Sequence, residues 1–220
     1  MKYKKIRGVI FDLDGTLLDT LADMQCTVNS VLLKYDYPPH SISKYKEFIG
    51  NGIENTLLAA LPNNYKEDFY TLLEETKRSY LENLNKNTTV YDGIYDILDH
   101  LIHSEMRLGI VTNKLHKYAT KCVEVFFNRY NILTLGAGNN FSIKPNPEGT
   151  KYVASELGVD PDHCLFVGDS GVDMQTAKRA GMISAGVLWG FREKKELENT
   201  GADFIFSTTI ELNEFFKKNI

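Results

Sequence analysis

VIFDLDGT, residues 9–16, is the stretch of sequence that decides the fold. Its apolar, strand-forming start runs directly into two carboxylates, Asp12 and Asp14. If the chain stays extended between them, both carboxylates point to the same side, and Gly15 then permits an abrupt turn. Same-side carboxylates repel each other unless a cation or a shared proton offsets their charge, and oxygen ligands suit Mg²⁺. The stretch therefore predicts a strand that ends at a magnesium site, the competing interpretation being an acidic turn that caps the next helix.

A second stretch, FVGDSGVD at residues 166–173, repeats this design after another apolar run. Asp169 follows the run directly, and Asp173 comes four residues later, within reach of Asp169 if a helix begins there. Because parallel strands end at the same edge of a sheet, where open α/β sheets bind ligands, we expect Asp12, Asp169 and Asp173 to lie together. A calcium loop is the alternative, but neither stretch has the longer acidic spacing of such a loop.

Two further stretches are candidates for binding phosphate. In GIVTNK, residues 109–114, Thr112 ends an apolar run and can donate a hydroxyl hydrogen bond to a phosphate oxygen. In IKPNPE, residues 143–148, two prolines stiffen the chain around Lys144, which predicts a fixed cation. Each signal is weak alone, since a threonine in this place is often a helix cap and a single lysine is usually solvated. Their order along the chain makes them specific.

The rest of the sequence alternates between short apolar runs and segments with helical spacing, which indicates an α/β fold. Strands are predicted at residues 6–11, 107–112, 163–168, 184–189 and 203–206, and helices at residues 95–103, 117–127, 147–157 and 172–180. Parallel neighbours require crossover connections, so this alternation favours a Rossmann-like, doubly wound parallel sheet with helices on both faces.

One interval, between Leu18 and Thr89, shows no convincing strand and several amphipathic helical patterns. Apolar residues recur at helical spacing over residues 21–35 and 65–84, and a shorter helix is predicted around residues 55–61. We therefore expect a catalytic core of residues 1–17 and 89–220 with an inserted helical cap domain at 18–88. The turn formed by Gly50, Asn51 and Gly52 is a candidate for facing the ligand, and an ordinary helix connection is the equal alternative.

Composition and charge narrow the class of protein. The 220 residues are 43% hydrophobic and 25% charged, with a formal net charge of −4. That charge argues against nucleic acid as a partner, because binding along phosphates needs clustered Lys and Arg. No stretch approaches the ~18 uncharged apolar residues of a membrane helix, so we expect a cytoplasmic protein without a membrane partner. The three cysteines are odd in number and far apart, which predicts reduced thiols, and a monomer and a homodimer are equally compatible with the sequence.

Taken in order, these motifs resemble those of the haloacid-dehalogenase-like (HAD) superfamily, whose phosphatases carry DxDGT, a strand-ending Ser or Thr, a Lys and GDxxxD-like acids. The helical insertion after the first motif is similar to the cap of one large branch. The TNK, KPxP and GDSxxD motifs and the VLWG stretch at residues 187–190 look most like the phosphoglycolate phosphatases of that branch. The resemblance covers essentially the whole chain.

The resemblance implies a role for each motif. Asp12 would attack phosphorus, and Asp14 would protonate the leaving oxygen and later deprotonate the hydrolytic water. Thr112 and Lys144 would cradle the transferring phosphoryl group. The implied ligands of Mg²⁺ are Asp12, the main-chain carbonyl of Asp14, and Asp169, with Asp173 orienting that shell. The implied substrate is a small phosphorylated metabolite such as phosphoglycolate, which Asn113 and the Gly50–Gly52 turn would also contact.

A β-phosphoglucomutase-like sugar phosphomutase of the same superfamily shares every site residue named above. A pyrophosphatase and a nucleotidase of the superfamily also stay open, because the four motifs handle only the shared phosphoryl group. A phosphoacceptor signalling domain also combines acids, a hydroxyl and a lysine on a parallel sheet. The motif order argues against that signalling domain, because such domains begin with an acidic pair, carry their acceptor Asp later, and lack a large helical insertion.

Overall fold

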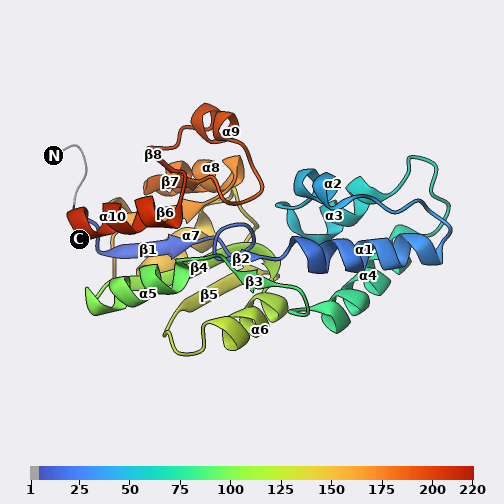
Figure 1. The fold of residues 1–220 in the computed structure, drawn as a ribbon, viewed down its shortest axis with the longest axis horizontal. Coiled ribbons are helices and arrows are strands. Elements are labelled where there is room, and N and C mark those ends of the chain that lie inside the picture. Colours follow the sequence, from blue (N-terminus) through green and yellow to red (C-terminus); the bar gives the residue numbers. More distant parts are fainter. Residues whose placement is uncertain (1–4) are drawn as a thin grey trace.

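The computed structural model describes residues 5–220 and contains a six-stranded sheet in the order β5-β4-β1-β6-β7-β8 (Figure 1). All neighbouring strands are parallel. The strands are β1 (Gly8–Phe11), β4 (Arg107–Leu115), β5 (Leu133–Ala137), β6 (Cys164–Gly168), β7 (Ile183–Val187) and β8 (Phe204–Phe206). Helical crossovers connect them, which confirms the predicted α/β class. Residues 1–4 of the predicted core segment lie outside the described residues.

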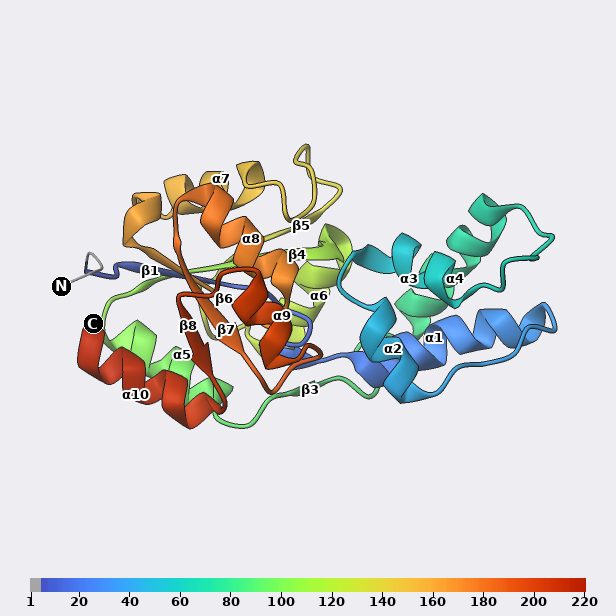
Figure 2. The same ribbon diagram turned by 90° about the horizontal axis from the view of Figure 1, so that it is seen from above.

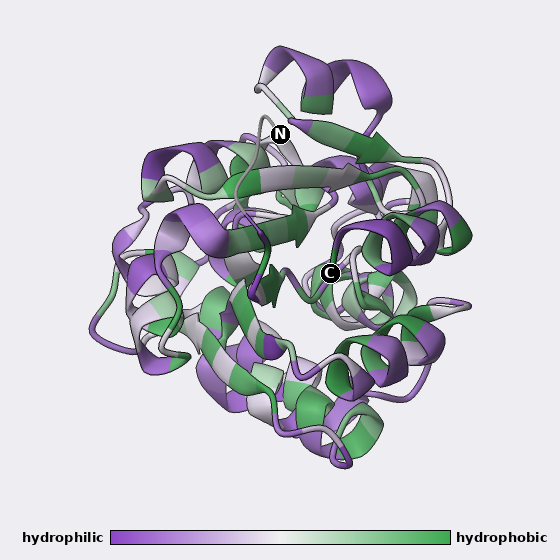
Figure 3. Cartoon of the chain, turned by 90° about the vertical axis from the view of Figure 1, so that its left-hand side faces the viewer, coloured by the Kyte–Doolittle hydropathy of each residue, from purple (hydrophilic) through white to green (hydrophobic). Residues whose placement is uncertain are grey.

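Helices cover both faces of the sheet, because side chains along each buried strand alternate between two apolar clusters. Val9 and Phe11 of β1 pack in one cluster and Ile10 in the other. The first cluster includes residues of α5 (Ile94–His103), α6 (His116–Phe126) and α10 (Thr209–Asn219), and the second includes residues of α7 (Glu148–Glu156) and α8 (Gly171–Ala180). Figure 2 shows these two helical layers, and Figure 3 shows hydrophobic strands between helices of mixed character.

The other helices form a separate unit at one end of the molecule, on the right in Figure 1. They are α1 (Leu21–Lys34), α2 (Ile42–Phe48), α3 (Gly52–Ala60) and α4 (Phe69–Asn83). Their apolar faces bury one another in a cluster of their own, which Tyr118 of α6 joins from the core. This unit therefore has its own hydrophobic interior and packs against the sheet domain near α6.

The two chain segments that join this unit to the sheet domain lie side by side. They pair as two short antiparallel strands, β2 (Leu18–Asp19) and β3 (Thr89–Val90). Asp23, fully buried in α1, accepts hydrogen bonds from the backbone N–H of Asn87 at 2.7 Å and from the hydroxyl of Thr88 at 2.6 Å. A buried carboxylate with several donors is satisfied in place, so it fastens the returning chain to the outgoing one.

Several elements differ from those that the sequence predicted. The interval from 18 to 89 was predicted to lack strands, yet β2 and β3 lie at its two ends. The second long helix begins at Phe69 rather than near residue 65, because the Asp68 carboxylate caps it by accepting a hydrogen bond from the Thr71 N–H at 2.9 Å. Strand β4 continues past Thr112 to Leu115 through an irregular register with β5.

Other elements were not predicted at all: the edge strand β5, the helices α2, α9 (Lys194–Asn199) and α10, and a short 3₁₀ helix at Pro161–His163. Within residues 5–220, no helix combines the length and the apolar character needed to cross a membrane.

Candidate active site

Three buried carboxylates gather at the carboxyl edge of the sheet. Asp12 follows β1, Asp169 follows the neighbouring strand β6, and Asp173 lies in the first turn of α8. Each offers a carboxylate oxygen within 4.8 Å of those of the other two. The Asp12 N–H donates to the carbonyl of Val167 at 2.9 Å, which holds the end of β1 against β6. Parallel pairing thus brings together residues more than 150 positions apart in sequence.

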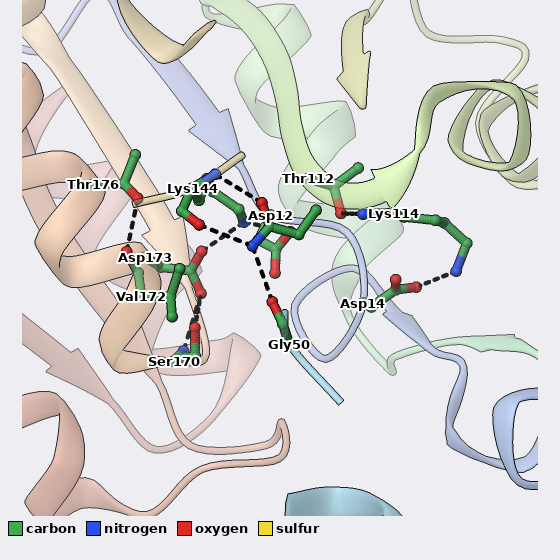
Figure 4. A network of polar contacts seen from close by, with 11 residues as sticks. Asp12, Asp14, Gly50, Thr112, Lys114, Lys144, Ser170, Val172, Asp173 and Thr176 are labelled. Carbon is green, nitrogen blue, oxygen red and sulfur yellow. Dashed lines mark hydrogen bonds and ion pairs between the residues drawn. The ribbon is translucent and has the colours of Figure 1, made fainter. Parts of the chain in front are cut away.

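The buried ammonium group of Lys144 lies between two of these acids (Figure 4). Its Nζ is 2.7 Å from Asp12 Oδ1 in an ion pair and donates a hydrogen bond to Asp173 Oδ1 at 2.7 Å. The second oxygen of Asp173 accepts from the N–H and the hydroxyl of Ser170, at 3.0 and 2.7 Å, in a capping box that starts α8. Asp173 is therefore held in place from both sides.

The charges at this site do not balance. Burial raises the pKa of Asp12 to about 7, because the opposing ammonium of Lys144 does not offset both burial and the neighbouring charge of Asp173. Burial, with the charges of Asp173 and Asp12, likewise raises the pKa of Asp169 well above its ordinary value. Burial would lower the pKa of Lys144, but the charges of Asp12 and Asp173 outweigh it and raise that pKa.

This imbalance fits a divalent cation. Like charges this close repel by roughly 3 kcal/mol per pair at an effective dielectric of about 20, more than the ~1 kcal/mol that one hydrogen bond contributes. Three buried carboxylates facing one ammonium therefore lack two positive charges. The donor set is all oxygen, which suits Mg²⁺, and Asp12, Asp169 and Asp173 are the residues whose carboxylates could approach it.

The glycine of the first motif makes room for Asp169. Gly15 has a φ of +86°, and a Cβ built on it would lie 2.4 Å from Asp169 Oδ2. The same carboxylate oxygen accepts a hydrogen bond from the N–H of Phe191 at 2.7 Å. Any larger residue at position 15 would need a strained backbone and would displace the carboxylate.

Asp14 does not join the three clustered carboxylates. Its carboxylate accepts a hydrogen bond from Lys114 Nζ at 2.7 Å, and Figure 4 shows this pair to one side of Asp12. The Lys114 side chain is 3% exposed, and the charge of Asp14 raises its pKa well above the ordinary value in spite of burial. The structure therefore places Asp14 beside the nucleophile candidate but pairs it with a residue to which the sequence assigned no role.

The two polar residues before Lys114 have different surroundings. The hydroxyl of Thr112 accepts a hydrogen bond from the Lys114 N–H at 3.3 Å, and its side chain lines the cleft above Asp12. The Asn113 amide is already engaged: it donates to the carbonyls of Gly50 and Lys144, at 3.0 and 3.1 Å, and accepts from the Lys144 N–H at 2.8 Å. Asn113 thus connects β4 with the Lys144 loop and with the turn before α3.

A cleft between the sheet domain and the helical unit contains most of the predicted site residues. Among those predictions, Asp12, Asp14, Gly50, Gly52, Thr112, Asn113 and Asp169 line it. Asn51 is exposed and is not part of the lining. Lys144 and Asp173 lie at the floor of the site, buried behind Asp12.

Among the lining residues that were not predicted are Lys114, Tyr80 and Arg192. Lys114 could have been found, because an extended chain places it on the same side as Thr112, by the same alternation that pairs Asp12 with Asp14. Tyr80 comes from α4, and Arg192 donates hydrogen bonds to the carbonyls of Lys46 and Ile49 at the end of α2. Neither residue could be predicted as part of the site from local sequence patterns, because each reaches the cleft from a segment that lies outside the acidic and phosphate-binding motifs.

Comparison with known proteins agrees with this geometry. Residues 9–187 match the model of the haloacid dehalogenase-like hydrolase family. A phosphoglycolate phosphatase of Aquifex aeolicus is 30% identical over 219 residues, covering 98% of this chain and 99% of the relative. Phosphoglycolate phosphatase 1 of Pseudomonas aeruginosa is 31% identical over 198 residues, covering 87% of this chain and 72% of the relative.

A solved structure shares the fold over nearly its whole length. The crystal structure of a protein described as a predicted phosphoglycolate phosphatase from Haemophilus somnus superimposes with a TM-score of 0.86 at 26% identity, covering 97% of this chain and 99% of that one. The family match sets aside a phosphoacceptor signalling domain. The chain belongs to the haloacid dehalogenase-like hydrolases, and it is a phosphatase acting on phosphoric monoesters.

Proposed function

We propose that this chain is a magnesium-dependent phosphatase that hydrolyses a small, phosphoglycolate-like monoester through an aspartyl-phosphate intermediate on Asp12. One observation carries the proposal: Asp12 ends a central strand between a buried ammonium, Lys144, and two further buried carboxylates, Asp169 and Asp173. A carboxylate repels an anionic phosphoryl group, so the site needs positive charge on both sides of the reacting atoms. Bound Mg²⁺ would supply the charge that Lys144 does not.

In the first step, a carboxylate oxygen of Asp12 attacks phosphorus, and the bond between phosphorus and the alcohol oxygen breaks. The electron pair of that bond goes to the alcohol oxygen, which takes a proton from Asp14. Thr112 donates its hydroxyl to a phosphoryl oxygen, and Lys144 offsets the charge of the carboxylate that becomes an acyl phosphate. Covalent catalysis divides one hard displacement into two easier ones.

In the second step, water attacks the phosphorus of the aspartyl phosphate and gives its proton to Asp14. The bond between phosphorus and Asp12 breaks, which restores the carboxylate and releases inorganic phosphate. Asp14 therefore acts first as an acid and then as a base. Its position beside Asp12, on the side of the cleft, supports both uses.

We further propose that residues 18–88 are a cap domain and that residues 1–17 and 89–220 are the catalytic core. The separate apolar interior of α1–α4 and the paired connecting strands β2 and β3 support this division. A cap that closes over the phosphoryl group excludes bulk water and selects substrates by size. The names of the relatives, phosphoglycolate phosphatases, support a small carboxylated phosphate ester as the substrate.

The test is phosphate release from 2-phosphoglycolate, a hexose phosphate, pyrophosphate and a nucleotide, each with Mg²⁺ and with a chelator. We expect turnover of the small monoester that needs Mg²⁺ and falls by at least ~10⁴-fold in Asp12→Asn, the scale reported when a nucleophile is removed. The exposed Asp96→Asn is the matched control and should keep the parent rate. Parent-level turnover by Asp12→Asn, or full turnover without a divalent cation, would exclude the proposal.

A further inference from the structure

The hydroxyl of Tyr80 is a buried donor without an acceptor among the described residues. Tyr80 is 1% exposed, and the charged group that interacts with its hydroxyl is the Lys114 ammonium, which is itself a donor, so the hydroxyl proton has no acceptor among the described residues. The side chain comes from α4 of the helical unit, lines the cleft, and packs edge to face on Tyr118 of α6, with ring centroids 5.1 Å apart. Buried hydroxyls are normally hydrogen-bonded, because an unsatisfied one costs free energy. An unsatisfied hydroxyl at the wall of a substrate cleft therefore indicates that a ligand group completes it.

A second donor lies directly beside this hydroxyl. The ammonium of Lys114 is 5.1 Å from the centroid of the Tyr80 ring and 2.7 Å from Asp14 Oδ1. An ammonium group has three donor hydrogens, of which the Asp14 carboxylate takes up one. The other basic side chain that lines the cleft is Arg192, and its guanidinium already donates to two carbonyls of the helical unit. Among the described lining residues, Lys114 is thus the cation with donors to offer a ligand.

The position of the two donors points to the leaving group rather than to the phosphoryl group. Lys144, Thr112 and Asp12 surround the place where phosphorus would be, and Lys114 lies beyond Asp14 (Figure 4). In the proposed mechanism, Asp14 protonates the alcohol oxygen, so donors beyond Asp14 face the rest of the alcohol. A hydroxyl and an ammonium are both donors, and their natural partner is an oxyanion.

We propose that Tyr80 and Lys114 form a leaving-group subsite that binds a carboxylate on the alcohol portion of the substrate. This inference rests on the proposed phosphatase function and assigns its substrate selectivity to two residues. Ile53, Leu115 and Phe191 line the same cleft, so a neutral leaving group would leave the Tyr80 hydroxyl unsatisfied. Because Tyr80 belongs to α4 and Lys114 to β4, the subsite is complete only when the helical unit lies against the sheet domain.

The experiment compares two substrates that differ in the carboxylate, 2-phosphoglycolate and ethyl phosphate, in Mg²⁺-containing buffer. We expect Tyr80→Phe, which removes one oxygen atom, to lower kcat/KM for 2-phosphoglycolate by about tenfold or more, and for ethyl phosphate by less than about twofold. Lys114→Met should lower the ratio of the two kcat/KM values further, and Lys114→Arg should restore part of that ratio. Melting curves of each variant report folding separately.

The matched control is Tyr118→Phe. Tyr118 packs edge to face on Tyr80, but its hydroxyl donates to the carbonyl of Lys77 at 2.8 Å, so its removal should leave the substrate ratio unchanged. Equal losses on both substrates in Tyr80→Phe, or an unchanged ratio in Lys114→Met, would overturn the subsite while leaving the phosphatase function in place. Failure of the parent protein to hydrolyse either ester would instead contradict the proposed function.

Discussion

At the scale of single residues, Lys144 is the centre of the charge balance, since it pairs with Asp12 and Asp173 and is 3% exposed. We predict that Lys144→Met, which keeps the volume and removes the charge, lowers kcat by at least ~10³-fold, because an unpaired nucleophile and the phosphoryl group then repel each other. Removing one partner of a buried ion pair also costs about 3–5 kcal/mol of unfolding free energy. Urea denaturation and phosphate release measure the two effects. The exposed Lys151→Met should change neither, and a fully active Lys144→Met would contradict the assigned role.

A second prediction concerns Gly15, where the effect of backbone strain can be separated from the effect of the close contact with Asp169. Gly15 and Gly158 both have positive φ, at +86° and +68°, but a Cβ at Gly158 would meet nothing within 4 Å. Gly158→Ala should therefore cost only the backbone strain, about 1–2 kcal/mol by thermal or urea unfolding. Gly15→Ala should cost at least as much and should also abolish phosphatase activity, because its Cβ displaces the Asp169 carboxylate. Equal activity in the two variants would show that the close contact has no catalytic importance.

The sequence anticipated much of the site at this scale. The alternation of an extended chain and the shared edge of parallel strands were enough to expect Asp12, Asp169 and Asp173 in one place, and the structure brings them within 4.8 Å. Their roles stay predictions. The pairing of Asp14 with Lys114 was missed because the strand was expected to end at Thr112, whereas β4 continues to Leu115. A lysine counted as part of a turn has no predicted direction, but a lysine in a strand does.

At the scale of elements, Asn113 couples three segments: strand β4, the loop of Lys144 and the turn at Gly50. Asn113→Ala removes three hydrogen bonds, two of them buried, and leaves backbone groups unsatisfied, so we predict a loss of about 2–3 kcal/mol in unfolding free energy. We also expect KM for the phosphate ester to rise, because the turn beside the cleft loses its attachment to β4. The exposed Asn51→Ala should be close to neutral in both measurements. A neutral Asn113→Ala would show that the turn is held by other contacts.

Elements with strong internal periodicity were predicted and those that depend on tertiary contacts were not. Strand β5 is a short edge strand that contains Gly136. A Cβ at this position would collide with the backbone of His116, so packing against a distant segment, and not strand propensity, requires the glycine. Strands β2 and β3 are two residues each and have no period to detect. Helix α10 did carry a usable signal, since Thr208 caps it by accepting from the Glu211 N–H at 3.2 Å and Leu212 and Phe216 are buried four residues apart.

At the scale of the whole molecule, the proposed metal binding at the acidic cluster would be coupled to stability. In the metal-free protein, burial raises the pKa of Asp12 to about 7, above the ~3.9 of an unfolded chain. The stability that this group contributes is therefore fully present below about pH 4 and is lost as the pH rises through about 7. A divalent cation offsets the carboxylate charge, so the gain in Tm on adding Mg²⁺ should be larger at about pH 8 than at about pH 5.5. A pH-independent gain in the parent, or the same pH dependence in Asp12→Asn, would contradict this account.

The helical unit has a hydrophobic interior of its own and also contacts the sheet domain. Arg192 and Asn113 reach the helical unit from the sheet domain, and Tyr80 reaches the cleft from the other side. Such contacts could not be predicted from local patterns, because each depends on how two independently packed units meet. The sequence predicted a sheet domain and an inserted helical unit. How these two parts are placed relative to each other is seen only in the structure.

The most direct test of the central claim is to trap the covalent intermediate. The protein is mixed with 2-phosphoglycolate and Mg²⁺, quenched in acid within one turnover, reduced with borohydride and sequenced by mass spectrometry. An aspartyl phosphate is reduced to homoserine, so the account predicts homoserine at position 12 and unmodified aspartate at positions 14, 169 and 173. Homoserine at another of these positions, or turnover that proceeds normally while Asp12 is never modified, would contradict it.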